Sequence, residues 1–140
     1  TSPVPRACSR PPVLTSPPAP LLPSAVVDTR TQDIPAAVLA GSRHALIDTL
    51  GCALAGTLEP VAELAAQYVQ EAGARGQATV WGRNVATTAA EAAFANGIAG
   101  HALDFDDVLA MMPAHPSAII LPALFAAASG QPVKAATSRG

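Results

Sequence analysis

The 140-residue chain has the length of one domain, and half of its residues are hydrophobic. Its formal net charge is -2, and only 13% of its residues are charged. This balance excludes a protein bound to nucleic acid through clustered basic residues, because such binding depends on many lysine and arginine contacts to phosphates. Aromatic residues make up only 4% of the chain, so its apolar content is mostly alanine, leucine, valine and isoleucine, as in helical proteins.

The apolar runs and the cysteines indicate where such a chain works. No run reaches the roughly 18 consecutive apolar residues of a membrane-spanning helix, so we expect a soluble protein without a membrane partner. Cys8 and Cys52 are too few for a disulfide framework and lack metal-ligand spacing. We therefore expect free thiols and a cytoplasmic protein. Mitochondrial import is the alternative, because residues 1–27 contain two arginines and no acid.

Proline divides the chain. Eight prolines lie between Pro3 and Pro23, and proline removes amide donors and interrupts helices. Residues 1–27 are therefore expected to form a disordered leader, followed by a folded helical domain over residues 28–130. Residues 131–140 are polar and lose the helical period, so we expect a disordered tail there.

Two helices are predicted in the first half of the domain. Apolar residues three, four and seven apart predict a helix over residues 35–55, with Pro35 in its first turn and Gly56 as its C-terminal cap. A second helix is expected from Pro60 to Gly73. The face of the first helix expected to be buried consists of Val38, Leu39, Leu46, Ile47, Leu50 and Leu54.

A short extended segment and a third helix follow. Residues 77–82, QATVWG, favour an extended connector or a very short strand. Thr88 and Glu91 have the spacing of a capping box, which predicts a helix over residues 88–103. Gly97 and Gly100 each weaken that helix by roughly 1 kcal/mol relative to alanine, so tight packing or a site must justify them.

A last helix is expected after residue 116. Ser117 is the candidate that caps its start. Pro122 lies within its apolar run and should kink it unless the regular part begins later.

Polar residues concentrate between the last two predicted helices. Residues 101–117 read HALDFDDVLAMMPAHPS and contain three aspartates and two histidines. Asp104, Asp106 and Asp107 repel one another at close range, and each loses free energy if it is buried without a partner. The segment is therefore either a solvated acidic loop or a site.

A proton-transfer site is the sharper interpretation. His115 lies close to a predicted helix N-terminus, where the helix dipole disfavours an imidazolium and attracts an anion. Asp104 supplies a second proton-handling group on the other side of the loop. Together the two side chains suit proton abstraction next to a carboxylate.

Other interpretations of these residues stay open. Asp106 could serve only to hold backbone amides, and His101 could either orient a carboxylate or pack against the chain. A divalent metal ion suits carboxylate ligands, but no further acidic residue lies near enough in sequence to complete its shell. We therefore expect neither a metal nor another cofactor.

The combined motifs resemble one family. AAFANGIAGHALDFDD over residues 92–107, followed by HPSAIILPALFAAA over residues 115–128, resembles the MmgE/PrpD family, which includes 2-methylcitrate dehydratases and cis-aconitate decarboxylases. HALIDTLGCALAG and ATVWG fit the N-terminal region of that family too. The resemblance covers roughly residues 34–128.

The resemblance implies a fold, a chemistry and a set of site residues. It implies an all-α N-terminal domain, joined in complete members to a lid domain and usually homodimeric, that acts on small di- and tricarboxylates without a metal. The family's catalytic aspartate falls on Asp104 and its HPS-motif histidine on His115. His101, Asp107 and Ser117 are the candidate substrate-binding residues.

Two departures affect the function that the resemblance implies. A threonine often follows the aspartates in the decarboxylases, and Val108 stands there, which favours dehydration of a polycarboxylate such as 2-methylcitrate. The family's further histidine and lysine and its lid domain have no counterpart in these 140 residues. We therefore expect a truncated chain that holds half of an active site and is inactive alone.

Two other functions are compatible with parts of the sequence. Residues 104–109, DFDDVL, match the signature of magnesium-dependent haloacid-dehalogenase-type phosphatases, but that motif must follow a buried strand and open a larger α/β domain. A helical fragment with an exposed apolar face could instead act as a non-catalytic association module.

Overall fold

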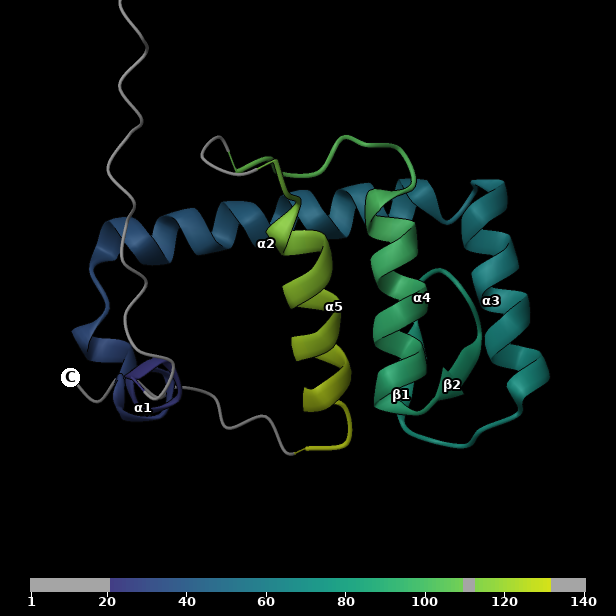
Figure 1. Ribbon diagram of the computed structural model, residues 1–140, viewed down its shortest axis with the longest axis horizontal. Coiled ribbons are helices and arrows are strands. Elements are labelled where there is room, and N and C mark those ends of the chain that lie inside the picture. The colour runs from purple at the N-terminus through teal and green to yellow at the C-terminus, as the bar shows by residue number, and fades with distance from the viewer. Residues whose placement is uncertain (1–20, 110–112, 132–140) are drawn as a thin grey trace, which may run out of the picture. The chain divides into compact units, whose positions relative to one another are not determined.

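The computed structural model describes residues 21–109 and 113–131 (Figure 1). The chain divides into two units, Thr1–Ala36 and Ala37–Gly140. The described part of the first unit contains α1, Leu21–Asp28, and a 3₁₀ turn, Thr31–Asp33. Helix α1 was not predicted, and it occupies the last residues of the expected leader.

Helix α1 tolerates its proline because of where that proline lies. Pro23 is in the first turn of the helix, where an amide N–H has no partner within the helix anyway. The leader residues 1–20 and the tail residues 132–140 lie outside the described residues, so their predicted disorder stays a prediction.

The second unit is helical, with one short hairpin. Its elements are α2 (Ala36–Gly56), α3 (Pro60–Ala72), β1 (Ala78–Val80), β2 (Val85–Thr87), α4 (Ala89–His101) and α5 (Pro116–Ala128). The predicted all-α fold class is confirmed, and the predicted helices begin and end within two residues of the observed ones. Strand β1 pairs antiparallel with β2, with Ala78 opposite Thr87; β2 was not predicted.

Two helix ends carry the caps that the sequence predicted. Gly73 ends α3 in the left-handed conformation, with φ of 64°. At the start of α4, the Thr88 hydroxyl accepts a hydrogen bond from the Glu91 amide at 3.3 Å. The Glu91 carboxylate in turn accepts hydrogen bonds from the hydroxyls of Thr87 and Thr88. These bonds, that from Thr87 first, hold the pKa of Glu91 below its ordinary value.

Helix α4 is the centre of the unit, and it packs against α3 and α5 (Figure 1). Small residues fill the contacts. Ala95 packs with residues of α3 and β1, and Ala92 packs with residues of β1 and α5. Asn96 fixes the hairpin to α4, because its amide oxygen accepts from the Trp81 N–H at 2.8 Å and its amide nitrogen donates to the Thr79 carbonyl at 3.0 Å.

The predicted buried face of α2 is wrong. The residues that α2 buries are Thr49, Ala53 and Gly56, whereas Ile47 is 68% exposed and Leu54 58% exposed. The reason is close approach between backbones. A Cβ atom at Gly56 would collide with the carbonyl oxygen of Ala99, so Gly56 is a packing residue inside the helix and not its predicted C-terminal cap.

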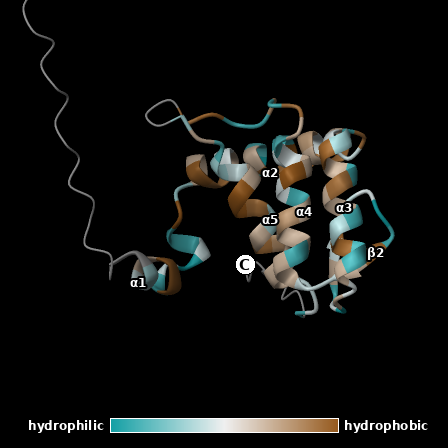
Figure 2. Ribbon diagram, turned by 45° about the vertical axis from the view of Figure 1, so that its right-hand side comes forward, coloured by the Kyte–Doolittle hydropathy of each residue, from teal (hydrophilic) through white to brown (hydrophobic). Residues whose placement is uncertain are grey.

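Many large apolar side chains therefore lie outside the core. Hydrophobic segments recur along α3, α4 and α5 in Figure 2, and several of their large side chains are more than half exposed, including Leu64, Tyr68, Phe94, Ile119 and Leu124. The tightly packed interior of the unit is made mainly of alanine.

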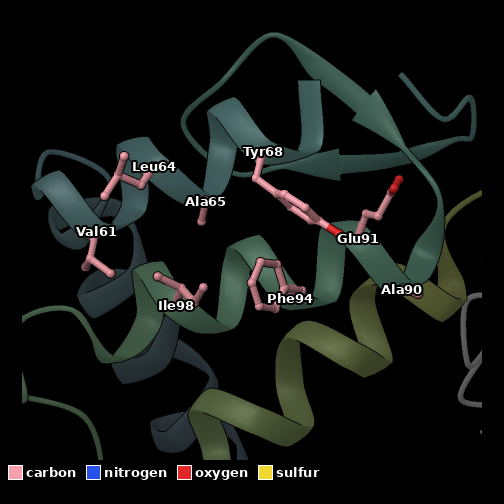
Figure 3. Close-up of a pocket in the computed structure, with 8 residues that line it drawn as sticks. All are labelled: Val61, Leu64, Ala65, Tyr68, Ala90, Glu91, Phe94 and Ile98. Atoms are coloured by element: carbon pink, nitrogen blue, oxygen red, sulfur yellow. The ribbon is translucent and has the colours of Figure 1, made fainter. Parts of the chain in front are cut away.

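Two apolar grooves flank α4. The groove between α3 and α4 has a volume of about 470 Å³, and in Figure 3 Leu64 and Tyr68 line it from α3 while Phe94 and Ile98 line it from α4. Phe94 and Ile98 also line the second groove, of about 610 Å³, between α4 and α5.

Within residues 21–109 and 113–131, no single helix is long and apolar enough to cross a bilayer. Helices α2 and α3 taken together have the length and apolar composition of a membrane-spanning segment, but they are bent by 85° at their junction.

Candidate functional site

The crossing of α4 and α5 brings the two predicted site segments together. A Cβ atom at Gly97 would lie 3.1 Å from the carbonyl oxygen of Ala118, and one at Gly100 would lie 3.6 Å from the Ala118 Cβ. Pro122 has no amide N–H to bond that carbonyl within α5, so the carbonyl faces Gly97 instead. Tight packing thus accounts for both glycines. Helix α5 runs from Pro116 to Ala128 with Pro122 inside it, so its regular part does not begin after the proline, and the kink expected in that case stays a prediction.

The loop after α4 turns sharply at Asp104. This residue adopts a left-handed conformation with φ of 55°, which aspartate tolerates better than most residues. Its amide donates to the His101 carbonyl at 3.0 Å. Further along, the Leu109 amide donates to the Ala114 carbonyl at 3.0 Å.

Asp106 lies between two imidazole rings. Its side chain has no exposed surface. One carboxylate oxygen lies 2.9 Å from His101 Nδ1 and the other 3.2 Å from the same atom. The second oxygen is also 3.3 Å from His115 Nδ1, and the two rings are 4.4 Å apart between centroids.

Asp104 and His115 face each other across the outer side of this cluster. Asp104 Oδ1 lies 3.6 Å from His115 Nε2, and the Asp104 side chain is 77% exposed while that of His115 is 27% exposed. One ring nitrogen of His115 therefore faces a buried carboxylate and the other faces an accessible one. This arrangement holds an imidazole by one side and leaves its other side for proton transfer.

Asp107 and Ser117 pair with each other. The Asp107 carboxylate accepts from the Ser117 amide at 3.1 Å and from its hydroxyl at 2.7 Å. The prediction that Ser117 caps α5 is wrong, because α5 begins at Pro116 and His115 occupies the cap position without a capping side chain. The anion at this helix N-terminus is Asp107 itself, so a substrate carboxylate would have to displace it there.

The electrostatics of the cluster favour a positive charge on His101. The hydrogen bond with Asp106 is the largest cause that raises the pKa of His101, and the charges of Asp106 and Asp104 act in the same direction, while partial desolvation opposes them. Because the His101 side chain is half exposed, its imidazolium can meet an anion in solution.

Both histidines line the groove between α4 and α5. The rest of that lining is apolar and includes Gly97, Ala118 and Ile119. Asp104 does not line the groove, but it lies next to His115, which does. The groove can therefore take a small molecule whose charged end reaches the imidazoles.

Four of these side chains offer donor atoms of the kind that bind a divalent ion. Ligand atoms of His101, Asp104, Asp106 and His115 all lie within 4.8 Å of one another. A tetrahedral zinc ion with bonds of about 2.0–2.1 Å holds its ligands about 3.4 Å apart, so the set would have to contract. Moreover, 2.9 Å between His101 and Asp106 is a hydrogen-bond distance, with a proton between the atoms.

The structure thus brings Asp104, His115 and His101 together and sets Asp107 and Ser117 aside as a separate pair. It adds Asp106, for which the sequence left open a role that only holds backbone amides. No sequence rule separates Asp106 from its neighbours, because its burial depends on where α4 and α5 cross. The phosphatase interpretation lacks its required context, since residues 104–109 follow a helix and not a buried strand.

One known family matches most of this chain. Residues 22–137 match the MmgE/PrpD N-terminal domain. The chain belongs to the MmgE/PrpD family. The match includes the last residues of the expected leader and most of the expected tail, whose assignment as disordered segments stays a prediction.

Similar proteins include cis-aconitate decarboxylases and a protein named as similar to them. The chain is 37% identical over 106 residues to a cis-aconitate decarboxylase-like protein of Aspergillus oryzae, covering 76% of this chain and 22% of that protein. It is 39% identical over 97 residues to the human cis-aconitate decarboxylase, covering 68% and 20%. The mouse enzyme of the same name is 36% identical over 97 residues. The chain spans about a fifth of the length of these relatives.

Proposed function

We propose that this MmgE/PrpD chain contributes the Asp104 and His115 proton-transfer pair of a lyase that acts on small di- and tricarboxylates. The observation that carries the proposal is the 3.6 Å approach of Asp104 Oδ1 to His115 Nε2 at the mouth of the α4–α5 groove. The similarity to cis-aconitate decarboxylases supports cis-aconitate as the first substrate to test.

The pair has the chemistry that decarboxylation of such a substrate needs. The bond between a carbon and its carboxylate breaks, carbon dioxide leaves, and the released electrons form a new double bond. The old double bond shifts its electrons to a carbon that takes up a proton. The His115 imidazolium would donate that proton from Nε2, and Asp104 would stabilise the imidazolium and help to restore it from solvent.

Dehydration of a hydroxy acid such as 2-methylcitrate is the second candidate. It needs a base that takes a proton next to a carboxylate and an acid that protonates the departing hydroxyl, and the same two side chains can fill both roles. Val108 favours this candidate. It puts an exposed apolar side chain directly after the aspartates, where a hydroxyl group is expected in decarboxylases.

His101 has a binding role in either reaction. Its imidazolium, stabilised by Asp106, offers a positive charge to one substrate carboxylate at the groove. We further propose that the protein works in the cytoplasm, without a metal, as a homodimer.

A chimaera tests the proposed activity. In the human cis-aconitate decarboxylase, the 97 matched residues would be replaced by those of this chain. We expect turnover of cis-aconitate in the presence of EDTA, measured as carbon dioxide release, and a loss of about 10²- to 10⁴-fold in His115→Ala. A folded chimaera that keeps its rate in His115→Ala would overturn the proposal.

Two further arms of the same assay separate the candidates. Val108→Thr is expected to raise decarboxylation if the missing hydroxyl limits it, whereas release of water from 2-methylcitrate by the parent chimaera would favour dehydration. Loss of all activity in EDTA, restored by a divalent ion, would instead assign a metal to the four-residue cluster.

Association without catalysis is supported by a separate observation. Large apolar side chains on α3, α4 and α5 are exposed, and such surfaces mark contacts with other protein. In the full 140-residue chain we expect a mass above that of the monomer in sedimentation. A chain that stays monomeric at high concentration would remove the support for the homodimer.

A further inference from the structure

Asp106 differs from the other acids of the site in its burial. Among the residues that the structure describes, it is the charged residue that is buried, at 3% exposure, whereas Asp104 is exposed and Asp107 is held by Ser117. A buried carboxylate is costly unless charges or hydrogen bonds compensate it. Its compensation here comes from the two imidazoles and not from backbone amides.

Both histidines present the same atom to Asp106. His101 Nδ1 lies 2.9 Å from one oxygen, and His115 Nδ1 lies 3.3 Å from the other. A neutral imidazole carries a single N–H, and the group that faces one nitrogen decides which nitrogen carries it. A carboxylate accepts hydrogen bonds and does not donate them, so Asp106 favours the proton on Nδ1 of each ring.

His115 shows where this effect matters. Its Nδ1 is buried and makes no hydrogen bond in the structure, although Asp106 is 3.3 Å away. Rotation of an imidazole about χ2 is soft, so a small turn of the ring aligns Nδ1–H with the carboxylate. In that orientation the unprotonated Nε2 faces the groove, and Asp104, which is 77% exposed and 3.6 Å away, competes less for the ring proton than the buried Asp106 does.

We propose that Asp106 is a positioning residue of the proton-transfer site, which fixes His115 as the Nδ1–H tautomer so that Nε2 exchanges its proton only with Asp104 and the substrate. The role of Asp106 in catalysis rests on the proposed function.

Imidazole tautomers can be measured directly in the full chain. The chain has three histidines, and long-range ¹H–¹⁵N correlation spectra distinguish Nδ1–H from Nε2–H in each. We expect His115 to be the Nδ1–H form at a pH where it is neutral. His44 is exposed on α2 and lies outside the Asp106 cluster, so it is the internal reference.

Substitution separates positioning from loop structure. Asp106→Ala removes both acceptor oxygens, whereas an asparagine would keep one, and we expect His115 to lose its Nδ1–H preference. Asp106→Glu, which keeps the carboxylate, should restore part of it. Asp107→Ala is the matched control, because this neighbouring carboxylate bonds Ser117 and no imidazole, and we expect the tautomer of His115 to be unchanged.

The outcomes are separable from those of the turnover assay. An Nε2–H tautomer of His115 in the unmodified chain would overturn the positioning role, even if Asp106→Ala fails to fold, and it would leave the pair of Asp104 and His115 in place. Failure of the chimaera to turn over any polycarboxylate would overturn the proposed function without changing the tautomer. An unchanged tautomer in folded Asp106→Ala would also overturn the positioning role.

Discussion

The two ends of α4 carry polar clusters that differ in how completely their groups are paired. At the N-terminal end, Thr87, Thr88 and Glu91 bond one another, and the Thr88 hydroxyl also accepts from the Glu91 amide. At the C-terminal end, one buried carboxylate faces two imidazoles, and a buried ring nitrogen of His115 has no hydrogen bond.

We interpret this difference as one between a cluster that stabilises the fold and a cluster that serves a function. Helix capping and the bonds among Thr87, Thr88 and Glu91 account for these polar side chains, so nothing further needs to be assigned there. Stability does not account for the C-terminal end, where an exposed aspartate in a left-handed conformation stands against a histidine. Incompletely paired, partly strained groups of this kind are typical of sites that act on a ligand.

The largest expected effect is at Asn96, whose two hydrogen bonds join α4 to the hairpin. Asn96→Ala leaves the Trp81 N–H and the Thr79 carbonyl without partners. Each unsatisfied group costs about 1–3 kcal/mol, so we expect a loss of about 2–5 kcal/mol in the free energy of unfolding. Urea denaturation measures it. A loss below about 0.5 kcal/mol would show that this region is not held by its hydrogen bonds.

Close backbone contact near the site should give the next largest effect. Gly56→Ala places a Cβ against the Ala99 carbonyl, and overpacking of this kind costs about 1–3 kcal/mol. Gly51→Ala is the matched control in the same helix, because nothing lies within 4 Å of its Cβ position. We expect it to stabilise the chain by about 0.5–1 kcal/mol. Equal effects in thermal melts would contradict the packing of α2 against α4.

The capping box should be worth less. Thr88→Ala removes the side-chain acceptor at the start of α4 and is expected to cost about 1 kcal/mol. Circular dichroism during urea denaturation gives the value. No change would mean that the cap seen at this end of α4 contributes nothing to folding.

The smallest effects concern pH, and they have opposite signs at the two ends. The pKa of Glu91 is lowered, so its stabilisation is present above its ordinary value of 4.5 and is lost as the pH falls through the lower folded value. The pKa of His101 is raised, so its stabilisation is present below 6.5 and is lost as the pH rises through the higher folded value.

Two variants test this contrast. The difference in unfolding free energy between the unmodified chain and Glu91→Gln should shrink in acid. The corresponding difference for His101→Gln should shrink toward alkaline pH. If both differences changed in the same direction, the contrast between the two ends would be wrong.

The sequence predicted local features well where neighbours in sequence decide them. The capping box of Thr88 and Glu91 and the left-handed Gly73 need only residues within a turn. The buried face of α2 was predicted wrongly because the helices meet through small residues, and large aliphatic residues such as Ile47 stay outside. Apolar periodicity alone does not reveal such contacts.

The site was predictable in its residue types but not in its pairing. Asp104 and His115 could be chosen from the loop chemistry and the family resemblance. The pairing of Asp107 with Ser117 and the burial of Asp106 depend on the crossing of α4 and α5, which is set by contacts between residues distant in sequence, such as Gly97 and Ala118.

The central claim is that the C-terminal end of α4 serves catalysis while its N-terminal end serves folding, and one paired measurement tests it. Asp104→Asn and Thr88→Ala would each be introduced into the human chimaera, and turnover of cis-aconitate and the free energy of unfolding would be measured on both. We expect Asp104→Asn to lose about 10²-fold or more in turnover with a stability change within about 0.5 kcal/mol, and Thr88→Ala to lose about 1 kcal/mol while keeping its turnover. Full turnover in a folded Asp104→Asn chimaera would contradict the account.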